Sequence, residues 1–295
     1  GEVPEVKNLF VSCGLNSIGI GSGGGVGKVT AEWLMTGHIN EDIFNYDIKR
    51  FQKFHSELGF IKDRITESLG DLYGMHWPYK QYKTSRNVKK LPYHNELKSF
   101  GACFGVSAGY ERPMWFALDG EKAEYEYSYN YQNWYPSVEY ETNNTLTNVG
   151  LYDLSPFSKF EIKSDKAYED LQRICTSNIK QEPGKCTYTH MLNKDGGIET
   201  DLTVVCIEQN HFRIISSAAT RERDKFHIKK HLSEGVELID VTDDYCVFGI
   251  FGPKSRLLMQ DLTSHDFSNK NFKFANSKYI EIDGTKIWTQ RLSYV

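Results

Sequence analysis

Apolar residues near the N-terminus change from a short continuous run to a helical spacing, and a glycine-rich stretch separates the two. Residues 9–11 form the run, and residues 14–28 form the glycine-rich stretch. The positions that then share one face of a helix are Val26, Val29, Trp33 and Leu34. This order predicts a strand, a glycine loop and a helix.

The glycine stretch indicates a contact with a nucleotide-type cofactor. Glycine reaches positive φ and lets a ligand approach the backbone, and a following helix N-terminus presents unpaired N–H groups. Gly19, Gly21 and Gly24 satisfy the dinucleotide pattern G-x-G-x-x-G. The second strand of a Rossmann unit is missing, however, because residues 40–42 read as a capped helix start. A tight strand–helix turn with no ligand remains the alternative.

Two segments follow before the pattern changes. Residues 39–95 read as mostly helical, with Phe44, Ile48 and Phe51 at helical spacing, and end in a proline-punctuated stretch. Residues 124–140 are rich in tyrosine that alternates with polar residues. This second segment is compatible with a strand, although we favour an aromatic loop packed on a neighbouring domain.

From about residue 150 onward the pattern is a mixture of strands and helices. The strand-like runs are 160–162, 202–207, 212–215, 247–250 and 286–292. Helical spacing occurs at 168–174 and 255–262. We therefore expect residues from about 145 to 295 to pack as one α/β unit.

Composition narrows the function classes. A length of 295 residues allows two domains, and 39% hydrophobic with 25% charged residues is ordinary for a globular protein. The net charge of −4 disfavours a nucleic-acid or anionic-membrane partner. No apolar run approaches the ~20 residues that span a bilayer. The six cysteines and nine histidines show no metal-ligand spacing, so we expect free thiols and no metal.

Several motifs, in order along nearly the whole chain, resemble one family of flavoenzymes. Asn16-Ser17 with residues 23–28, and then residues 47–51, resemble the end of the FAD domain and the start of the central domain in the sarcosine and dimethylglycine dehydrogenase family. Residues 85–92 and 109–116 resemble that family's passage into its folate domain. The motifs similar to the folate domain itself, an aminomethyltransferase (glycine cleavage T-protein) unit, are residues 153–157, 191–203 and 252–256.

The resemblance implies an α+β architecture. We expect the C-terminal part of an FAD-dependent amine oxidoreductase domain, followed by the N-terminal part of a T-protein-like folate-binding domain. The expected boundaries are 1–38 for the end of the FAD domain, 39–95 for the central domain and 96–295 for the truncated folate domain. The chain lacks an initiator Met and stops inside a strand pattern, so we expect an internal segment of a longer protein, inactive alone.

The resemblance also implies a reaction. FAD removes a hydride equivalent from sarcosine or dimethylglycine, and tetrahydrofolate captures the one-carbon unit from the resulting iminium. Electron-transfer flavoprotein is the implied electron acceptor, and the implied location is the mitochondrial matrix in a eukaryote or otherwise the cytoplasm. The pyruvate dehydrogenase phosphatase regulatory subunit shares this architecture without catalysis, so a regulatory role is the alternative.

Site residues follow from the same resemblance. The residues expected near the flavin ring, where N–H groups stabilise negative charge, are Leu15, Asn16, Ser17, Gly19, Gly23, Gly24 and Gly25. For the folate we expect Tyr188 to contact the pteridine, with a half-buried strand tyrosine as the alternative.

Asp201 is the expected catalytic carboxylate. It lies before an apolar strand, where we expect it partly buried at the strand mouth, ready to orient or deprotonate the N10 region of the folate. Pattern alone favours an Asp that ends the preceding Gly-Gly turn, and the resemblance reverses that preference. His190 has no carboxylate partner visible in the sequence, so we assign it a structural role.

Overall fold

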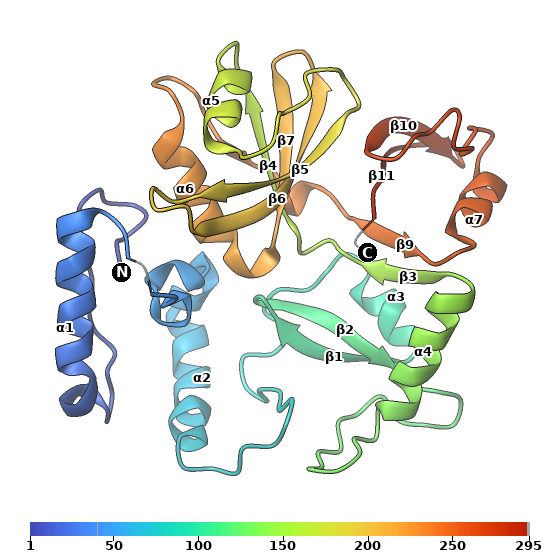
Figure 1. The fold of residues 1–295 in the computed structure, drawn as a ribbon. Helices are drawn as coiled ribbons and strands as arrows, with labels where there is room; N and C mark the ends of the chain where they lie inside the picture. Colours follow the sequence, from blue (N-terminus) through green and yellow to red (C-terminus); the bar gives the residue numbers. More distant parts are fainter. Residues whose placement is uncertain (40, 294–295) are drawn as a thin grey trace.

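A five-stranded antiparallel sheet, with strand order β5-β6-β7-β4-β8, forms the centre of the C-terminal half of the protein. The computed structural model describes residues 1–39 and 41–293. Figure 1 shows this sheet in the upper part of the molecule. The strands are β4 (Ser158–Lys163), β5 (Cys186–Leu192), β6 (Ile198–Glu208), β7 (His211–Ser216) and β8 (Ile239–Asp240).

Alternation along the strands builds the main hydrophobic core on one face of this sheet. Leu202, Val204 and Cys206 on β6 pack there with Phe212 and Ile214 on β7, all buried. Two helices, α5 (Ala167–Ile174) and α6 (Arg221–His231), contribute to the same core. Since neighbouring side chains on a strand point to opposite faces, the odd-numbered residues of β6 face away from the core.

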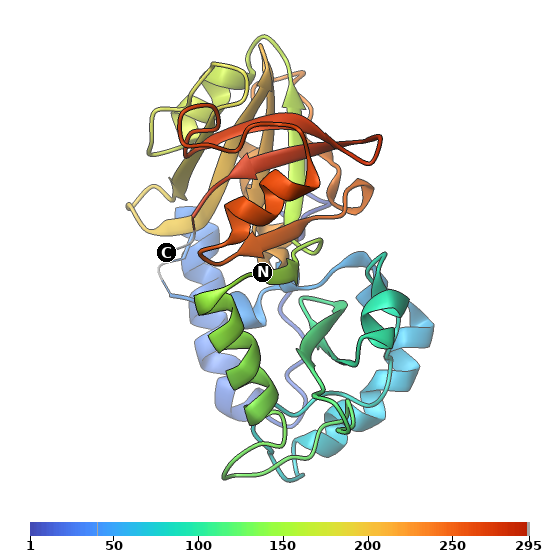
Figure 2. The ribbon, with the colours of Figure 1, turned by 90° about the vertical axis from the view of Figure 1, so that its right-hand side faces the viewer.

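The lower part of the molecule contains a further group of helices and strands (Figures 1 and 2). They are α2 (Leu58–Asp71), α3 (His94–Ser99), the hairpin of β1 (Ala102–Ser107) with β2 (Tyr110–Phe116), and α4 (Tyr135–Thr147). A second set lies beside the main sheet: β3 (Gly150–Asp153) paired with β9 (Phe248–Phe251), α7 (Ser255–Leu262), and β10 (Asn276–Ile282) paired with β11 (Thr285–Arg291). The strands and helices predicted after residue 150 are thus confirmed.

The glycine-rich stretch is mostly helix, which corrects the predicted loop. Helix α1 (Gly19–Thr36) includes Gly19, Gly23, Gly24 and Gly25. Helix growth is cooperative, so each added residue gains a hydrogen bond that offsets the cost of up to ~1 kcal/mol for a helical glycine. The non-helical part is confined to residues 14–18.

The predicted strand at residues 9–11 is also wrong. Only Phe10 forms a bridge, with Glu2, because no longer partner strand lies beside this segment in the described chain. The ring of Phe10 instead packs edge-on against Trp33 of α1, with centroids 5.5 Å apart.

Two further segments differ from their predictions. The helix expected from residues 40–51 is replaced by two short 3₁₀ turns, η1 (Phe44–Tyr46) and η2 (Ile48–Arg50); residue 40 itself lies outside the described residues. The side chain of Asp47 accepts the Lys49 N–H and so begins a new turn there. The tyrosine-rich segment is a loop up to Trp134, as favoured, but α4 begins at Tyr135, next to Pro136 in its first turn.

A network of charged side chains joins the lower part to the main sheet. Arg221 at the start of α6 pairs with Asp240 at 2.9 Å and with Asp243 at 3.4 Å. Asp243 also pairs with Lys89 at 3.2 Å and accepts a hydrogen bond from the Tyr110 hydroxyl. Residues from the segment between α2 and α3, from β2, from the start of α6 and from the chain after β8 thus meet at one point.

The cysteines are free, as predicted. Cys103, Cys175, Cys186 and Cys206 are buried, and Cys13 and Cys246 are exposed. Burial raises the pKa of the Cys175 thiol to about 12, so this thiol stays protonated and inert. Within the described residues, none of the helices has the length and apolar character needed to cross a membrane.

Candidate functional site

Tyr188 and Asp201 lie side by side on the face of the sheet that points away from the core. Asp201 pairs in register with His190, so Tyr188, two residues earlier on β5, projects from the same face. The Tyr188 hydroxyl donates to Asp201 Oδ2 at 3.3 Å. Both side chains are open to solvent, and Tyr188 is 60% exposed. The structure therefore brings the two predicted folate residues together.

The setting of Asp201 differs from the expectation in one respect. Its carboxyl is exposed within β6 rather than partly buried at the strand mouth, because odd-numbered residues of this strand face away from α5 and α6. The turn before it is closed by Asn193, whose Oδ1 accepts the N–H groups of Asp195 and Gly197. The turn-closing role considered for Asp201 thus belongs to Asn193.

His190 lies opposite Asp201 on the neighbouring strand, and its side chain contacts the Tyr188 hydroxyl rather than the carboxylate itself. Its Nε2 lies 3.4 Å from the Tyr188 hydroxyl, and the two rings meet edge to face with centroids 5.3 Å apart. Partial burial, then the charge of Asp201 and the hydrogen bond to it, raise the pKa of Tyr188, which keeps this phenol protonated. Only the hairpin register, and no local pattern, brings these three side chains together.

The residues predicted for the flavin lie at the start of α1. Leu15, Asn16 and Ser17 form the turn that enters the helix, and Ser17 has a φ of 64°. Gly19 is the first helical residue, and no side chain of the described chain caps this end. The first-turn N–H groups of α1 are thus available to an electronegative group. A Cβ added at Gly23, Gly24 or Gly25 would meet none of the described atoms within 4 Å.

Helix α1 connects its own N-terminal turn, the candidate flavin site, to the hairpin that carries the candidate folate site. At the C-terminal end of α1, the Thr36 carbonyl accepts from Lys194 Nζ at 2.9 Å, and His38 contacts Asp195. Both partners belong to the turn of the hairpin that carries Tyr188 and Asp201. The helix has 18 residues, which at about 1.5 Å each is roughly 27 Å.

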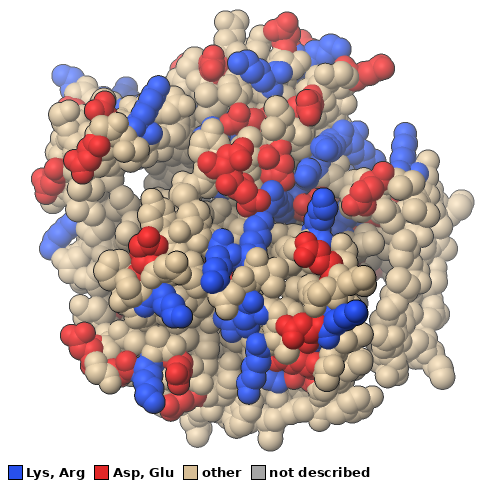
Figure 3. All heavy atoms as spheres, turned by 180° about the vertical axis from the view of Figure 1, so that it is seen from behind, with Lys and Arg blue, Asp and Glu red and all other residues tan. Residues whose placement is uncertain are grey.

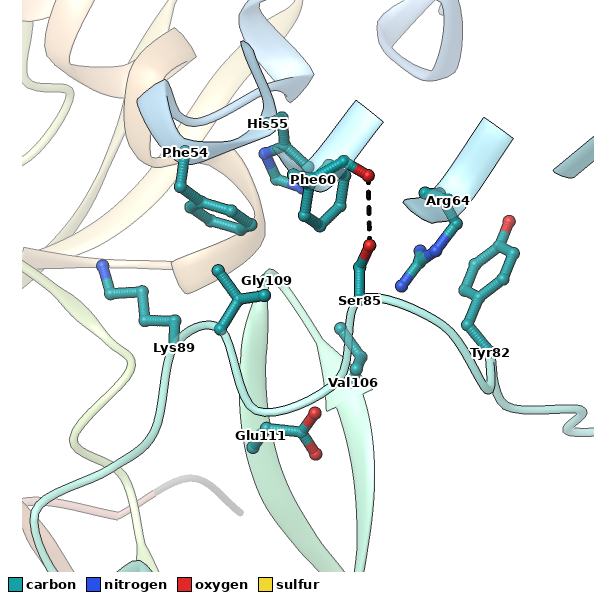
Figure 4. Close-up of a pocket in the computed structure, with 11 residues that line it drawn as sticks. Phe54, His55, Phe60, Arg64, Tyr82, Ser85, Lys89, Val106, Gly109 and Glu111 are labelled. Carbon is teal, nitrogen blue, oxygen red and sulfur yellow. Dashed lines mark hydrogen bonds between the residues drawn. The ribbon is translucent and has the colours of Figure 1, made fainter. Parts of the chain in front are cut away.

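Two cavities lie away from Tyr188 and Asp201. One, of about 170 Å³, is lined by residues 54–55, by α2, by the segment between α2 and α3, and by the β1–β2 hairpin (Figure 4). There the Arg64 guanidinium stacks on Tyr82 at 3.9 Å, and Ser85 donates to the Phe60 carbonyl at 3.1 Å. The other, of about 630 Å³, lies between the end of α1, residues 41–49, the hairpin turn and α6.

Charge is mixed over the back of the molecule, where Figure 3 shows acidic and basic side chains interspersed. Within the described residues, no three His, Cys, Asp or Glu side chains gather as a metal site.

The fold of the chain is similar to that of an aminomethyltransferase. The structure of glycine cleavage system aminomethyltransferase T from Bartonella henselae superposes with a TM-score of 0.56 at 20% identity, over 70% of this chain and 51% of that one. The family described as the GCVT N-terminal domain matches residues 93–295, and the family described as the FAD dependent oxidoreductase central domain matches residues 36–90. The chain belongs to the GCVT N-terminal domain family and carries an FAD oxidoreductase central-domain segment before it.

Longer relatives combine the same two parts. The chain is 36% identical to 4-methylaminobutanoate oxidase (formaldehyde-forming) of Paenarthrobacter nicotinovorans, over 100% of this chain and 36% of that protein. It is 29% identical to human mitochondrial sarcosine dehydrogenase (100% and 37%) and 30% identical to rat mitochondrial dimethylglycine dehydrogenase (98% and 34%). The chain thus spans about a third of the length of these relatives, and the predicted resemblance is confirmed.

Proposed function

We propose that this chain is the segment of an FAD-dependent amine oxidoreductase that joins its flavin domain to its folate domain. Residues 1–38 would complete the flavin domain, 39–95 the central domain, and 96–295 the first part of the folate domain. The observation that carries the proposal is the exposed Tyr188–Asp201 pair on a GCVT-type sheet that follows an FAD oxidoreductase central-domain segment.

The start of α1 fits the flavin. Its first-turn N–H groups lack a side-chain cap, and a flavin ring offers carbonyl oxygens that such groups bind. The bare backbone at Gly23, Gly24 and Gly25 leaves space for close approach, since no described atom stands within 4 Å of a Cβ added there. Bound FAD would supply the oxidation of the amine by accepting a hydride equivalent. The residues at this end of α1 would orient the ring and stabilise negative charge on it.

The Tyr188–Asp201 pair fits tetrahydrofolate. The pteridine and its N10 region present N–H donors, which an exposed carboxylate can accept, and a flat ring, which a tyrosine can contact. Asp201 would orient or deprotonate the folate nitrogen as it captures the one-carbon unit. Asp201 is the catalytic residue of this proposal, and Tyr188 is a binding residue.

The relatives suggest the substrate class. They are named for sarcosine, dimethylglycine and 4-methylaminobutanoate, each of which joins an N-methyl amine to a carboxylate. We infer an N-methyl amino acid, with sarcosine or dimethylglycine as the first substrates to test. Electron-transfer flavoprotein is the proposed acceptor, in the mitochondrial matrix or the bacterial cytoplasm according to source.

A regulatory role is the second candidate. The mouse pyruvate dehydrogenase phosphatase regulatory subunit is 30% identical over 89% of this chain. The exposed Tyr188–Asp201 pair supports the enzyme, because an adjacent phenol and carboxylate suit a flat ligand with N–H groups.

The test uses the complete protein with its bound flavin. It is mixed without oxygen with sarcosine, dimethylglycine or 4-methylaminobutanoate, and flavin bleaching and 5,10-methylenetetrahydrofolate are followed with and without tetrahydrofolate. We expect at least one amine to bleach the flavin and tetrahydrofolate to divert the product from free formaldehyde. Bleaching with formaldehyde alone would remove the folate half of the proposal, and no bleaching by any amine would favour the regulatory role.

A further inference from the structure

The hydroxyl of Tyr188 lies between two side chains, those of Asp201 and His190. It is 3.3 Å from Asp201 Oδ2 and 3.4 Å from His190 Nε2. His190 and Asp201 are direct cross-strand partners, so the three groups form one cluster on the exposed face of β5 and β6. Nothing in the proposed function uses His190.

Hydrogen-bond chemistry determines which group donates and which accepts within this cluster. The carboxylate of Asp201 can only accept, so the single proton of the Tyr188 hydroxyl is donated to it. The contact with His190 is then made when Nε2 carries hydrogen and donates to the phenol oxygen. A hydroxyl that accepts one hydrogen bond becomes a stronger donor in the next. His190 therefore acts on Asp201 through Tyr188.

The backbone of His190 is fixed by two hydrogen bonds to Thr176. The His190 N–H donates to the Thr176 hydroxyl at 3.3 Å, and the His190 carbonyl accepts from the Thr176 N–H at 2.9 Å. This segment covers the outer edge of β5, where Cys175 also forms a bridge to Met191. The ring of Tyr188 packs against that of His190, which restricts the phenol to the direction of Asp201.

We propose that His190 is a positioning residue of the folate site: its Nε2–H holds the Tyr188 hydroxyl toward Asp201, so that the carboxylate presents its other oxygen to the folate nitrogen. This inference rests on the proposed role of Asp201. The alternative is an ordinary cross-strand contact of surface side chains, which supports the sheet and adds nothing to folate capture.

Three substitutions of His190 separate the hydrogen bond donated by Nε2 from the packing of the ring. His190→Gln places an amide N–H at the reach of Nε2, whereas His190→Leu keeps the bulk and removes the donor. His190→Asn reaches only as far as Nδ1 and serves as a second donor-deficient variant if the leucine protein fails to fold. Each is made in the native background and again with Tyr188→Phe, in the complete flavin-loaded protein.

The measurement is the fraction of oxidised amine recovered as 5,10-methylenetetrahydrofolate, with the KM for tetrahydrofolate taken separately. We expect His190→Leu and His190→Asn to lower the ratio of captured to released product about threefold to tenfold, the range of one hydrogen bond, and His190→Gln to restore it. In the Tyr188→Phe background the leucine and asparagine changes should have no further effect, since their path to Asp201 is already removed.

Two outcomes overturn the inference. One is an unchanged capture ratio in the folded His190→Leu or His190→Asn protein, and the other is an equal loss with and without the Tyr188 hydroxyl. Asp201→Asn in the same experiment distinguishes the two proposals. If Asp201→Asn alone lowers capture, only the role of His190 fails; if it has no effect, the proposed folate site itself fails.

Discussion

Asp201 and Asp240 are carboxylates on strands of the same sheet in opposite environments. Asp240 accepts from Arg221 at 2.9 Å and from the Thr242 hydroxyl at 2.7 Å. Burial raises the pKa of the Asp240 carboxyl, but the hydrogen bonds and charge of Arg221 and the hydrogen bonds of Thr242 lower it by more. The resulting pKa is about 2. Asp201 is exposed and contacts Tyr188, so it retains the capacity to bind a ligand. Asp240 supports the fold, whereas Asp201 is exposed and can contact a ligand.

His227 on α6 makes stability depend on pH. Burial, and then the nearby charges of His231, Lys230 and Arg223, lower the pKa of His227 to about 4. The folded state therefore favours neutral imidazole, and its stability falls as pH decreases from about 6.5, the ordinary histidine pKa, toward 4.

Replacing His227 with Gln should remove this dependence. Between pH 7 and pH 4.5 the native protein should lose about 2–3 kcal/mol more free energy of unfolding than the His227→Gln variant. Urea titrations at the two pH values measure the difference, which cancels the carboxyl groups that titrate in both proteins. Parallel losses in the two proteins would show that His227 is not held neutral.

The half-buried Arg86 and the buried Glu111 form an ion pair that ties the segment between α2 and α3 to strand β2. Glu111 accepts from Arg86 Nε at 2.8 Å and Nη2 at 2.7 Å, and from the Asn87 N–H at 2.6 Å. The Glu111 side chain is 3% exposed. Arg86→Met leaves this carboxylate without its counter-charge, so we expect a loss of about 3–5 kcal/mol in the free energy of unfolding.

The matched control for this pair is the double variant Arg86→Met with Glu111→Gln. It removes both charges, so its loss should be clearly smaller than the sum of the two single losses. Additive losses, measured by urea unfolding, would indicate that the two side chains do not act as a pair.

At the scale of elements, α1 is the helix with the least support from its own sequence. It contains six glycines among its 18 residues, GIGSGGGVGKVTAEWLMT, and has no buried residue. A glycine inside a helix costs ~1 kcal/mol relative to alanine. These glycines lower the stability of the helix and leave its backbone uncovered by side chains.

The substitution Gly24→Ala tests how much glycine lowers the stability of α1. Because an added Cβ meets none of the described atoms within 4 Å, the substitution should stabilise this chain by up to ~1 kcal/mol and raise its helical circular dichroism. In the flavin-loaded protein, Gly24→Val should shift the flavin absorbance or slow its reduction, since a β-branched side chain occupies the approach to the helix. An unaltered spectrum, flavin content and turnover would show that this face does not meet the flavin.

Elements were predictable where one face of a strand or helix is buried. Strands β6 and β7 pack apolar residues on the core, and their alternation appears in the sequence. The turns η1 and η2 depend instead on single contacts such as the Asp47 side chain with the Lys49 N–H, which carry no periodic signal. The N-terminal half of α1 differs from the prediction because a glycine-rich pattern suggests a loop. Cooperative hydrogen bonding along the helix overrides that local preference.

At the scale of the whole molecule, the family resemblance predicted Tyr188 and Asp201 as site residues, and the structure places His190 beside them. The cross-strand pairing of His190 with Asp201 depends on the hairpin register and on a bulge between Met191 and Leu192. One residue of slippage would place Asp201 on the core face. No pattern in the sequence specifies that bulge, so His190 could not be assigned without the fold.

The substitution Asp201→Asn tests the central claim most directly, in the complete flavin-loaded protein supplied with its amine and tetrahydrofolate. Asn is nearly isosteric, and the flavin site is proposed to lie in another domain, so flavin reduction and the melting temperature should stay close to native. Recovery of 5,10-methylenetetrahydrofolate should fall by about 10²-fold or more, the lower end of general acid–base effects, and free formaldehyde should rise to match. Native partitioning between methylenetetrahydrofolate and formaldehyde in the folded variant would contradict the account.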